Sequence, residues 1–514
     1  MEGKEAMTSV NKHQRPTSSL IFSALVATLG SWYAAGYINV ALNVPQAYIV
    51  SWIRHVECNR QSVQENHTES YKLWCSPLTD EEESFILRDN IKLNTIWSVV
   101  NSIVAAGVFL STFSCTYLIK RFGLKGTMYI TSVIYLMGCF LATLTSAVHV
   151  YELLIVSRFL CGLSEGVIAV AAVMYISEIT PAKLRGAFGT LPMIMLVLGM
   201  LTANTLGLPM ILGNESRWPI LLALQGIPVV LMCVCLPFCP DSPRQLFLVK
   251  GDKEGAEKAL IWLRRTTEVQ DELAAMQREQ NMLEKGKSVP DISLFGIFKD
   301  AYLRYIFGIC AVPMFVKQFS GYVCILYYST SIFRQAGLDH LYSAYASLAM
   351  WLVYLTFSLI SMSLVDRLGR RIMLLISHTG MMVGMTLFTI FMLLSGQYAV
   401  EWAKFGCIAS IFFWMAFYTT GSSSVPWFLP SELFPQEARA AAMTWTSILY
   451  SGFSVTTSLT FPLVVFVLEE YTFLIFVAAI ALGTVYVLWK LPETKGMAID
   501  EIQVLLRHRF KGSA

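Results

Sequence analysis

Twelve apolar stretches, each long enough to cross a lipid bilayer, run through this chain and constrain its fold more than any other feature. A membrane-spanning helix needs about 20 predominantly apolar residues. The stretches that reach this length are residues 20–53, 93–119, 127–148, 153–177, 186–213, 218–239, 305–333, 341–365, 372–400, 405–431, 440–468 and 471–489. With 55% hydrophobic and 14% charged residues, a soluble chain could not bury its apolar surface. The sequence therefore predicts an all-α protein with twelve transmembrane helices in the lipid bilayer.

The distribution of Lys and Arg predicts how these helices are oriented. An even number of spans places both termini on one side, and the segments on that side carry 28 Lys and Arg residues against 8 on the other. Basic residues are enriched in cytoplasmic loops, so we expect a multi-pass protein, in the plasma membrane, with both termini cytoplasmic. The N-glycosylation sequons at Asn66 and Asn214 both fall outside under this orientation, and Asn66 is the predicted acceptor. Cys58 and Cys75 share the outer loop and could form a disulfide there.

The chain is predicted to consist of two related halves joined by a charged insert. A Ser-Glu-x-x-Pro motif with a following Arg recurs 254 residues later, which pairs Glu178 with Glu432 and Arg185 with Arg439. Such a repeat indicates duplication of a six-helix unit, the design of transporters whose site lies between two bundles at mid-membrane. Helical spacing at 253–263 and 272–283 predicts short cytoplasmic helices in the insert. The expected divisions are 1–19 (N-terminus), 20–240 (first bundle), 241–300 (linker), 301–491 (second bundle) and 492–514 (tail).

Several short motifs at the ends of the predicted spans carry a resemblance to a known family. They are Gly36-Tyr37, Asn43-Val44-Pro45-Gln46, Arg158-Phe159-Leu160-Cys161-Gly162, Leu184-Arg185-Gly186, Gln318-Phe319-Ser320-Gly321, Tyr327-Tyr328-Ser329, Asp366-Arg367-Leu368-Gly369-Arg370-Arg371, Val425-Pro426-Trp427-Phe428 and Pro492-Glu493-Thr494-Lys495-Gly496. Over residues 20–500 the chain resembles the sugar-porter family of the major facilitator superfamily, specifically the facilitative hexose transporters of animals. The resemblance implies a major facilitator fold and a uniporter of a hexose such as glucose or fructose, working by alternating access. We expect it to function as a monomer without a cofactor.

Charged residues at the predicted inner helix ends are candidates for a gate. Carboxylate and guanidinium groups there can form charge-assisted bonds between the bundles. Such bonds would hold the outward-open state together and break when the inner side opens. The predicted inner-gate residues are Glu178, Arg185, Asp366, Arg370, Arg371, Glu432 and Arg439, together with Arg158, which the resemblance adds and which we place near the inner end of the fourth span.

The candidate binding site differs from the family pattern. A hexose needs neutral hydrogen-bonding groups and an aromatic face. Gln318 and Trp427 match the family, whereas Met193, Val323, Tyr354, Thr419 and Tyr450 stand where it has polar or acidic residues, and Lys317 replaces a second Gln. The predicted substrate-binding residues are Gln318, Lys317, Trp427, Asn43, Tyr327, Tyr354, Met193, Thr419 and Tyr450.

These substitutions leave the solute open. A pocket with one ammonium and several aromatic rings suits an anionic solute such as urate at least as well as a hexose, and a non-transporting solute sensor is a further alternative. Glu165 is the one carboxylate inside the spans besides the helix ends, and the first span has no acid, which favours a uniporter over proton coupling. No nucleophile with a base and no metal cluster or cofactor motif is visible. We therefore expect no enzyme activity, no metal and no nucleic-acid partner.

Overall fold

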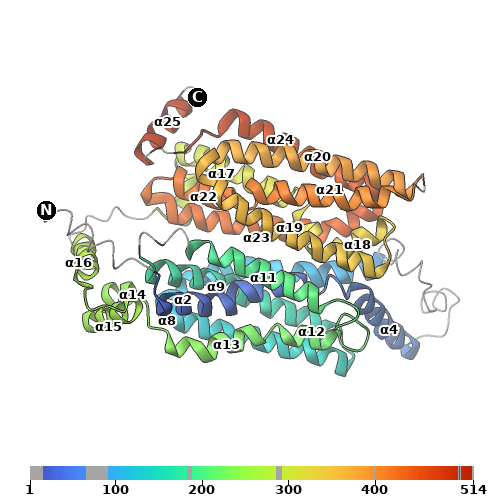
Figure 1. The fold of residues 1–514 in the computed structure, drawn as a ribbon, viewed down its shortest axis with the longest axis horizontal. Coiled ribbons are helices and arrows are strands. Elements are labelled where there is room, and N and C mark those ends of the chain that lie inside the picture. Colours follow the sequence, from blue (N-terminus) through green and yellow to red (C-terminus); the bar gives the residue numbers. More distant parts are fainter. Residues whose placement is uncertain are drawn as a thin grey trace.

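The computed structural model describes residues 16–64, 91–181, 184, 188–284, 292–398, 400–495, 497 and 499–511, and nearly all of them lie in helices. The first half of the chain forms one helical bundle and the second half packs against it as another (Figure 1). Helices α14 (Pro243–Leu248), α15 (Lys253–Arg264) and α16 (Gln270–Glu284) lie at the end of the molecule that also holds α25 (Ile499–Lys511). We call this the linker end and the other the opposite end.

The first bundle contains six spans. The first span is built from α2 (Ser18–Thr28), the π-helix η1 (Leu29–Tyr33) and α3 (Ala34–Val40). The second and third are two helices within the range labelled α8 (Ile91–Val148), and they meet at a kink at Gly123. The remaining spans are α9 (Glu152–Ile179), α11 (Leu191–Leu206), and α12 (Trp218–Leu224) with α13 (Ile227–Cys235).

The second bundle repeats this plan. Its first span is α17 (Ala301–Gln318) with α18 (Tyr322–Gln335), followed by α19 (His340–Leu368) and α20 (Arg370–Gly396). The fourth span joins α21 (Ala403–Phe417), the π-helix η4 (Tyr418–Ser422) and α22 (Val425–Leu433). The last two spans are α23 (Gln436–Leu468) and α24 (Thr472–Lys490). The twelve-helix architecture and the linker helices expected from the sequence are thus confirmed.

Two expected boundaries were wrong. The apolar stretch 20–53 does not form one span, because α3 ends at Val40 and α4 (Gln46–Gln64) begins only after a turn that contains Pro45. Proline favours an extended residue before it and ends a helix there. Conversely, the loop expected at 119–126 is helical except at Gly123, whose φ of 74° reverses the chain direction between two spans. Glycine adopts this positive φ without a steric penalty.

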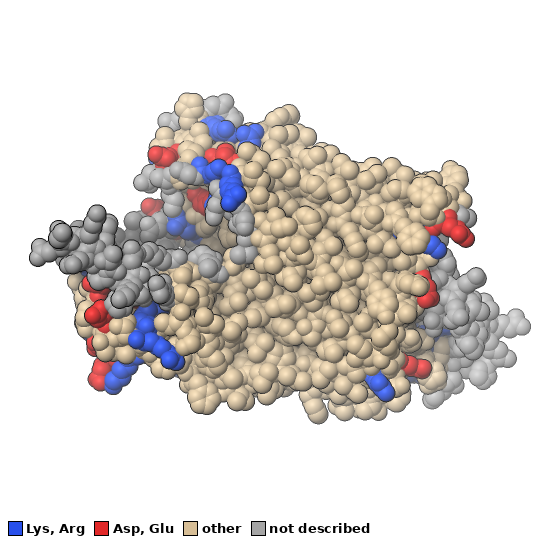
Figure 2. Space-filling model, viewed as in Figure 1, with Lys and Arg blue, Asp and Glu red and all other residues tan. Residues whose placement is uncertain are grey.

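The surface of the molecule supports its placement in a bilayer. Lys, Arg, Asp and Glu gather at the two ends, and the broad surface between them shows none on the face drawn in Figure 2. Large apolar side chains are exposed on the helices of this belt, including Leu482 (74%), Phe140 (67%) and Phe113 (56%). In a bilayer, lipid chains would cover these apolar side chains, whose contact with water would be unfavourable.

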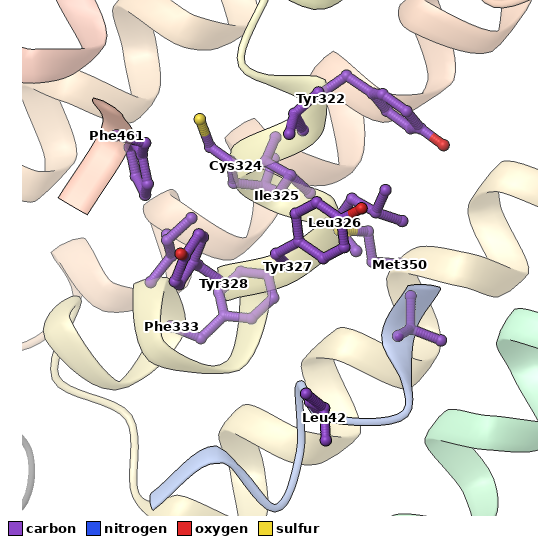
Figure 3. Packing of buried hydrophobic residues seen from close by; sticks show 14 of the residues in the cluster. Leu42, Tyr322, Cys324, Ile325, Leu326, Tyr327, Tyr328, Phe333, Met350 and Phe461 are labelled. Atoms are coloured by element: carbon purple, nitrogen blue, oxygen red, sulfur yellow. The ribbon is translucent and has the colours of Figure 1, made fainter. Parts of the chain in front are cut away.

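The two bundles share one large core. α8 packs against α23, α11 against α19, and α3 against α18, so each bundle contributes to the contact. Figure 3 shows part of this shared cluster: Tyr327 and Tyr328 of α18 lie between Leu42 of the first bundle and Phe461 of α23. The residues that concern function lie along this interface.

Candidate functional site

A break in the seventh span positions Lys317 and Gln318. They occupy the end of α17, and the chain resumes as α18 after Gly321, which has a φ of +93°. The carbonyl end of a helix carries partial negative charge, so a cation in its last turn is favoured. Broken helices near mid-membrane are also where transporters expose polar backbone to solutes. The sequence thus places a cation and an amide at an interrupted helix.

A second break, in the tenth span, supplies the partner of the Lys317 ammonium. The π-helix η4 ends at Ser422, and in the turn that follows the Trp427 N–H donates to Ser424 O (3.1 Å). Pro426 has no N–H to donate. The Ser423 carbonyl is therefore available, and Lys317 Nζ donates to it at 2.6 Å. One hydrogen bond joins the two interrupted helices.

Two aromatic rings flank the same ammonium. Lys317 Nζ lies 5.1 Å from the ring centroid of Trp427 and 5.4 Å from that of Tyr450. The two rings are 5.1 Å apart and inclined by 51°. Cation–π attraction strengthens when the cation is desolvated, and the Lys317 residue is only 4% exposed. Within the described residues no carboxylate forms an ion pair with Lys317.

Gln318 completes this group. The residue is fully buried, and its Nε2 donates to Tyr450 O at 2.8 Å. Its Oε1 is buried and accepts no hydrogen bond from the described residues. A buried acceptor without a hydrogen bond destabilises the folded protein by about 1–3 kcal/mol. A ligand hydroxyl that donates to this oxygen would remove that penalty, so binding would be favoured. We call Lys317, Gln318, Ser423, Trp427 and Tyr450 the central site.

Of three other predicted binding residues, Thr419 contacts this group, because its carbonyl accepts a hydrogen bond from Ser423 Oγ (3.1 Å). Thr419 is buried, and its hydroxyl donates to Ala416 O (2.9 Å) of its own helical segment. The Tyr354 ring lies 6.5 Å from that of Tyr418. Met193 is partly buried on α11, a helix that contacts α19 across the bundle interface. Their assignment to the binding site stays a prediction.

Asn43 and Tyr327, also predicted to bind substrate, instead connect the bundles. Asn43 Nδ2 donates to Ser329 Oγ, and Asn43 Oδ1 accepts the backbone N–H of Thr330 (3.2 Å). The Tyr327 hydroxyl donates to Asn39 Oδ1 (3.3 Å).

A further bond runs from the Ser331 hydroxyl to Gln46 Oε1 (2.6 Å). These bonds all join the α3–α4 segment to α18. We call them the α3–α18 contact, and they hold the bundles together toward the opposite end.

Glu165 is linked to the α3–α18 contact from within the first bundle. Asn39 Nδ2 donates to Glu165 Oε1 at 3.2 Å, while Glu165 Oε2 is buried and receives no hydrogen bond from the described residues. Through Asn39, whose Oδ1 accepts from the Tyr327 hydroxyl, this carboxylate of the first bundle is connected to the second bundle.

The expected position of Arg158 was wrong. It lies six residues after the start of α9, which begins at the opposite end and runs to Ile179 at the linker end. Its Nη1 donates to Ile38 O (3.0 Å) and its Nε to Val100 O (3.1 Å). Glu178 is 20 residues further along the same helix, about 30 Å away at 1.5 Å per residue. Arg158 therefore cannot belong to a gate at the linker end; it joins three helices of the first bundle.

The bonds described for Arg370, Arg371, Glu432 and Glu178 lie within one half. Arg370 Nε pairs with Glu432 Oε1 (2.9 Å), whose other oxygen accepts from Thr494 (2.8 Å). Arg371 Nη2 donates to Leu488 O (2.6 Å). In the first half, the Ser242 hydroxyl donates to the Glu178 carboxylate. The hydrogen bonds described for these groups do not cross between the bundles, so the expected bonds between bundles stay a prediction for another conformation.

Some predicted residues cannot be placed. Arg185 and Asn66 lie outside the described residues, as does Cys75, while Cys58 is disulfide-bonded. Asp366 belongs to α19, but its side chain is not among those described. Arg439 is partly buried on α23.

Sequence reasoning missed two contributors. Asn39 stands one helical turn before Asn43, and a second amide in a membrane span was a usable signal. The Ser423 carbonyl carried no sequence signal beyond the nearby Pro426, because its availability depends on a π-helical turn.

Comparisons with known proteins agree with this arrangement. The family model described as "Sugar (and other) transporter" matches residues 20–506. Solute carrier family 2, facilitated glucose transporter member 3 of the dog (Canis lupus familiaris) is 34% identical over 495 residues, covering 95% of this chain and 92% of that protein. Facilitated glucose transporter member 1 of the chicken (Gallus gallus) is 32% identical over 497 residues, covering 96% and 94%.

Solved structures share the fold. The proton:xylose symporter XylE bound to 6-bromo-6-deoxy-D-glucose superposes with a TM-score of 0.71 at 20% identity, covering 96% of this chain and 100% of that one. The inward-open conformation of XylE from E. coli gives a TM-score of 0.72 at 20% identity, covering 95% and 99%. The matched family model, the relatives and the twelve-helix fold lead to one conclusion: the chain belongs to the sugar (and other) transporter family and is a multi-pass membrane protein.

Proposed function

We propose that the protein is a facilitative uniporter that carries a hexose, such as glucose or fructose, across the membrane by alternating access. The observation that carries this proposal is the central site: an unsatisfied amide acceptor, an ammonium and an indole lie where two interrupted helices meet, beside the interface of two bundles. An amide can bond a sugar hydroxyl, and an aromatic ring can pack against the C–H face of a pyranose. The relatives' names as facilitated glucose transporters support the same substrate class.

The bonds between the bundles support a particular step of the cycle. The α3–α18 contact joins the bundles toward the opposite end, whereas the bonds described for Arg370, Glu432 and Glu178 at the linker end lie within one half. We infer that this conformation is open at the linker end, and that its reversal requires the α3–α18 contact to break.

The distribution of basic residues orients this cycle. The helices of the linker end carry many Lys and Arg residues, and such segments are retained in the cytoplasm. The linker end and both termini are therefore cytoplasmic in our proposal, and the conformation described is inward-open. The protein would act as a monomer in the plasma membrane, glycosylated at Asn66.

Uptake into proteoliposomes tests the proposal. Purified protein is reconstituted, and initial uptake is measured for glucose, fructose, inositol, dehydroascorbate and urate, with empty liposomes as the control. We expect saturable, gradient-driven uptake of at least one hexose, with trans-stimulation by unlabelled hexose, as alternating access requires. Uptake should not change when the pH gradient is collapsed, because the first span contains no acid. Absence of uptake for every hexose by correctly folded protein would contradict the proposal.

A further inference from the structure

The Lys317 ammonium has more hydrogen-bonding capacity than the described residues use. It has three N–H donors, and the described residues supply one acceptor, Ser423 O, together with the faces of Trp427 and Tyr450. None of these partners carries a negative charge. A buried charge inside a membrane is costly unless it is paired or faces a water-filled path. The site therefore holds a positive charge that a ligand could neutralise.

A neutral hexose does not neutralise that charge, but a carboxylate does. Hydrogen bonds between an ammonium and a carboxylate are shorter and stronger than those to a neutral hydroxyl. Ser423 O, as a carbonyl, orients the ammonium without cancelling its charge. A solute with a carboxylate would thus gain more from Lys317 than the corresponding neutral sugar.

The rest of the central site is suited to a hydroxylated ring. The unpaired Oε1 of Gln318 can accept one ligand hydroxyl. The Trp427 and Tyr450 rings, 5.1 Å apart, provide apolar faces next to the ammonium. We therefore propose, building on the transport function above, that the central site binds sugar acids, with the carboxylate of a hexuronate at Lys317 and a ring hydroxyl at Gln318.

Glu165 limits the charge that such a ligand can carry. Its carboxylate belongs to the other bundle, is connected through Asn39 to Tyr327 of the second bundle, and has an oxygen without a hydrogen bond from the described residues. That oxygen can accept a hydroxyl but repels a second negative group. The site should accept a monoanion such as D-glucuronate and reject dianionic sugar phosphates.

The test compares D-glucuronate, D-glucose and D-glucose 6-phosphate in proteoliposomes. Wild-type protein should carry labelled glucuronate, and a valinomycin-imposed potential, positive inside, should accelerate glucuronate uptake while leaving glucose uptake unchanged. Glucose 6-phosphate should neither be carried nor compete. In Lys317→Gln, which restores an amide, the KM for glucuronate should rise at least tenfold and that for glucose less than threefold. Lys258→Gln, an exposed lysine of α15, is the matched control and should behave as wild type.

Different failures have different meanings. If glucose is carried but glucuronate is neither carried nor inhibitory, the sugar-acid proposal is wrong and the transport function stands. If Lys317→Gln weakens both solutes equally, Lys317 acts only as a bond between the interrupted helices, and the proposal is again wrong. If no solute is carried by folded protein, the underlying transport function fails. Should Lys317→Gln not fold, the potential dependence of wild-type uptake decides the question by itself.

Discussion

Among single residues, some buried polar atoms have hydrogen-bond partners within the protein and others do not. Arg158 donates from Nη1 and Nε to backbone carbonyls of two other helices, and only its Nη2 lacks a partner among the described residues. Gln318 and Glu165, in contrast, each keep an oxygen that the described residues leave without a donor. Because an unpaired buried acceptor is unfavourable, these atoms mark where a solute or water is expected. The oxygen of Gln318 is the one of these that lies within the central site, next to Lys317.

The indole of Trp427 should contribute directly to solute affinity. Trp427→Ala removes both the ring beside Lys317 and its packing on Tyr450. We expect the KM for hexose to rise about tenfold, equivalent to about 1.4 kcal/mol of binding free energy. Trp427→Phe, which keeps an aromatic face, should retain most of the affinity. Uptake kinetics check this, and an unchanged KM in the alanine variant would remove Trp427 from the site.

Arg158 should act through stability. Arg158→Met removes the two hydrogen bonds from the guanidinium to Ile38 O and Val100 O, and a hydrogen bond from a charged group contributes about 1.5–3 kcal/mol. We expect a clear fall in the melting temperature of the purified protein, measured by fluorescence-detected thermal unfolding. Arg217→Met, at an exposed position, is the control. A variant that is as stable as wild type but slow in transport would instead indicate a gating role.

At the scale of elements, interrupted helices create the site. The break between α17 and α18 brings Lys317 and Gln318 to a helix end, and η4 leaves the Ser423 carbonyl available. Both breaks depend on local conformations that a regular helix excludes: a positive φ at Gly321 and a π-helical turn before Pro426. Backbone groups that a helix normally pairs within itself are thereby offered to side chains and solutes.

Gly321→Ala should therefore impair the site. An alanine at a φ of +93° is strained by about 1–2 kcal/mol, and its Cβ would lie 2.7 Å from Met385 Cε. We expect reduced transport and lower thermal stability. Two variants serve as controls. Gly251→Ala also has a positive φ, but its Cβ would meet no atom within 4 Å, and Gly189→Ala has neither a positive φ nor a close contact. If all three variants behave alike, the conformation at Gly321 has no special role.

At the scale of the whole molecule, the sequence predicted the architecture better than the site. Length and hydropathy identify all twelve spans, because the bilayer thickness leaves little choice for an apolar helix. The breaks within spans were missed, since π-helical turns and interhelical bonds depend on packing between segments far apart in the chain. Lys317 was recognised from its charge, whereas its ring and carbonyl partners required the structure. Arg158 was misplaced because the direction of the fourth span was read wrongly.

The two bundles also explain why one site can serve two sides. The α3–α18 contact closes one end with bonds between neutral side chains and a backbone N–H, which can break without exposing unpaired charges. The charged groups at the other end, such as Arg370 and Glu432, have partners within their own bundle in this conformation. Rocking of one bundle on the other can then exchange the open and closed ends around the central site.

The most direct test of this account measures the distances between the bundles at both ends. Spin labels would be placed on Met210→Cys and Tyr398→Cys at the opposite end, and on Phe122→Cys and Lys495→Cys at the linker end, all at exposed positions, with the other free thiols replaced. Pulsed electron paramagnetic resonance in nanodiscs, with and without hexose, reports both distances. We predict two populations at each pair whose proportions change in opposite directions at the two ends. A single distance at each end, unchanged by any transported solute, would contradict the account.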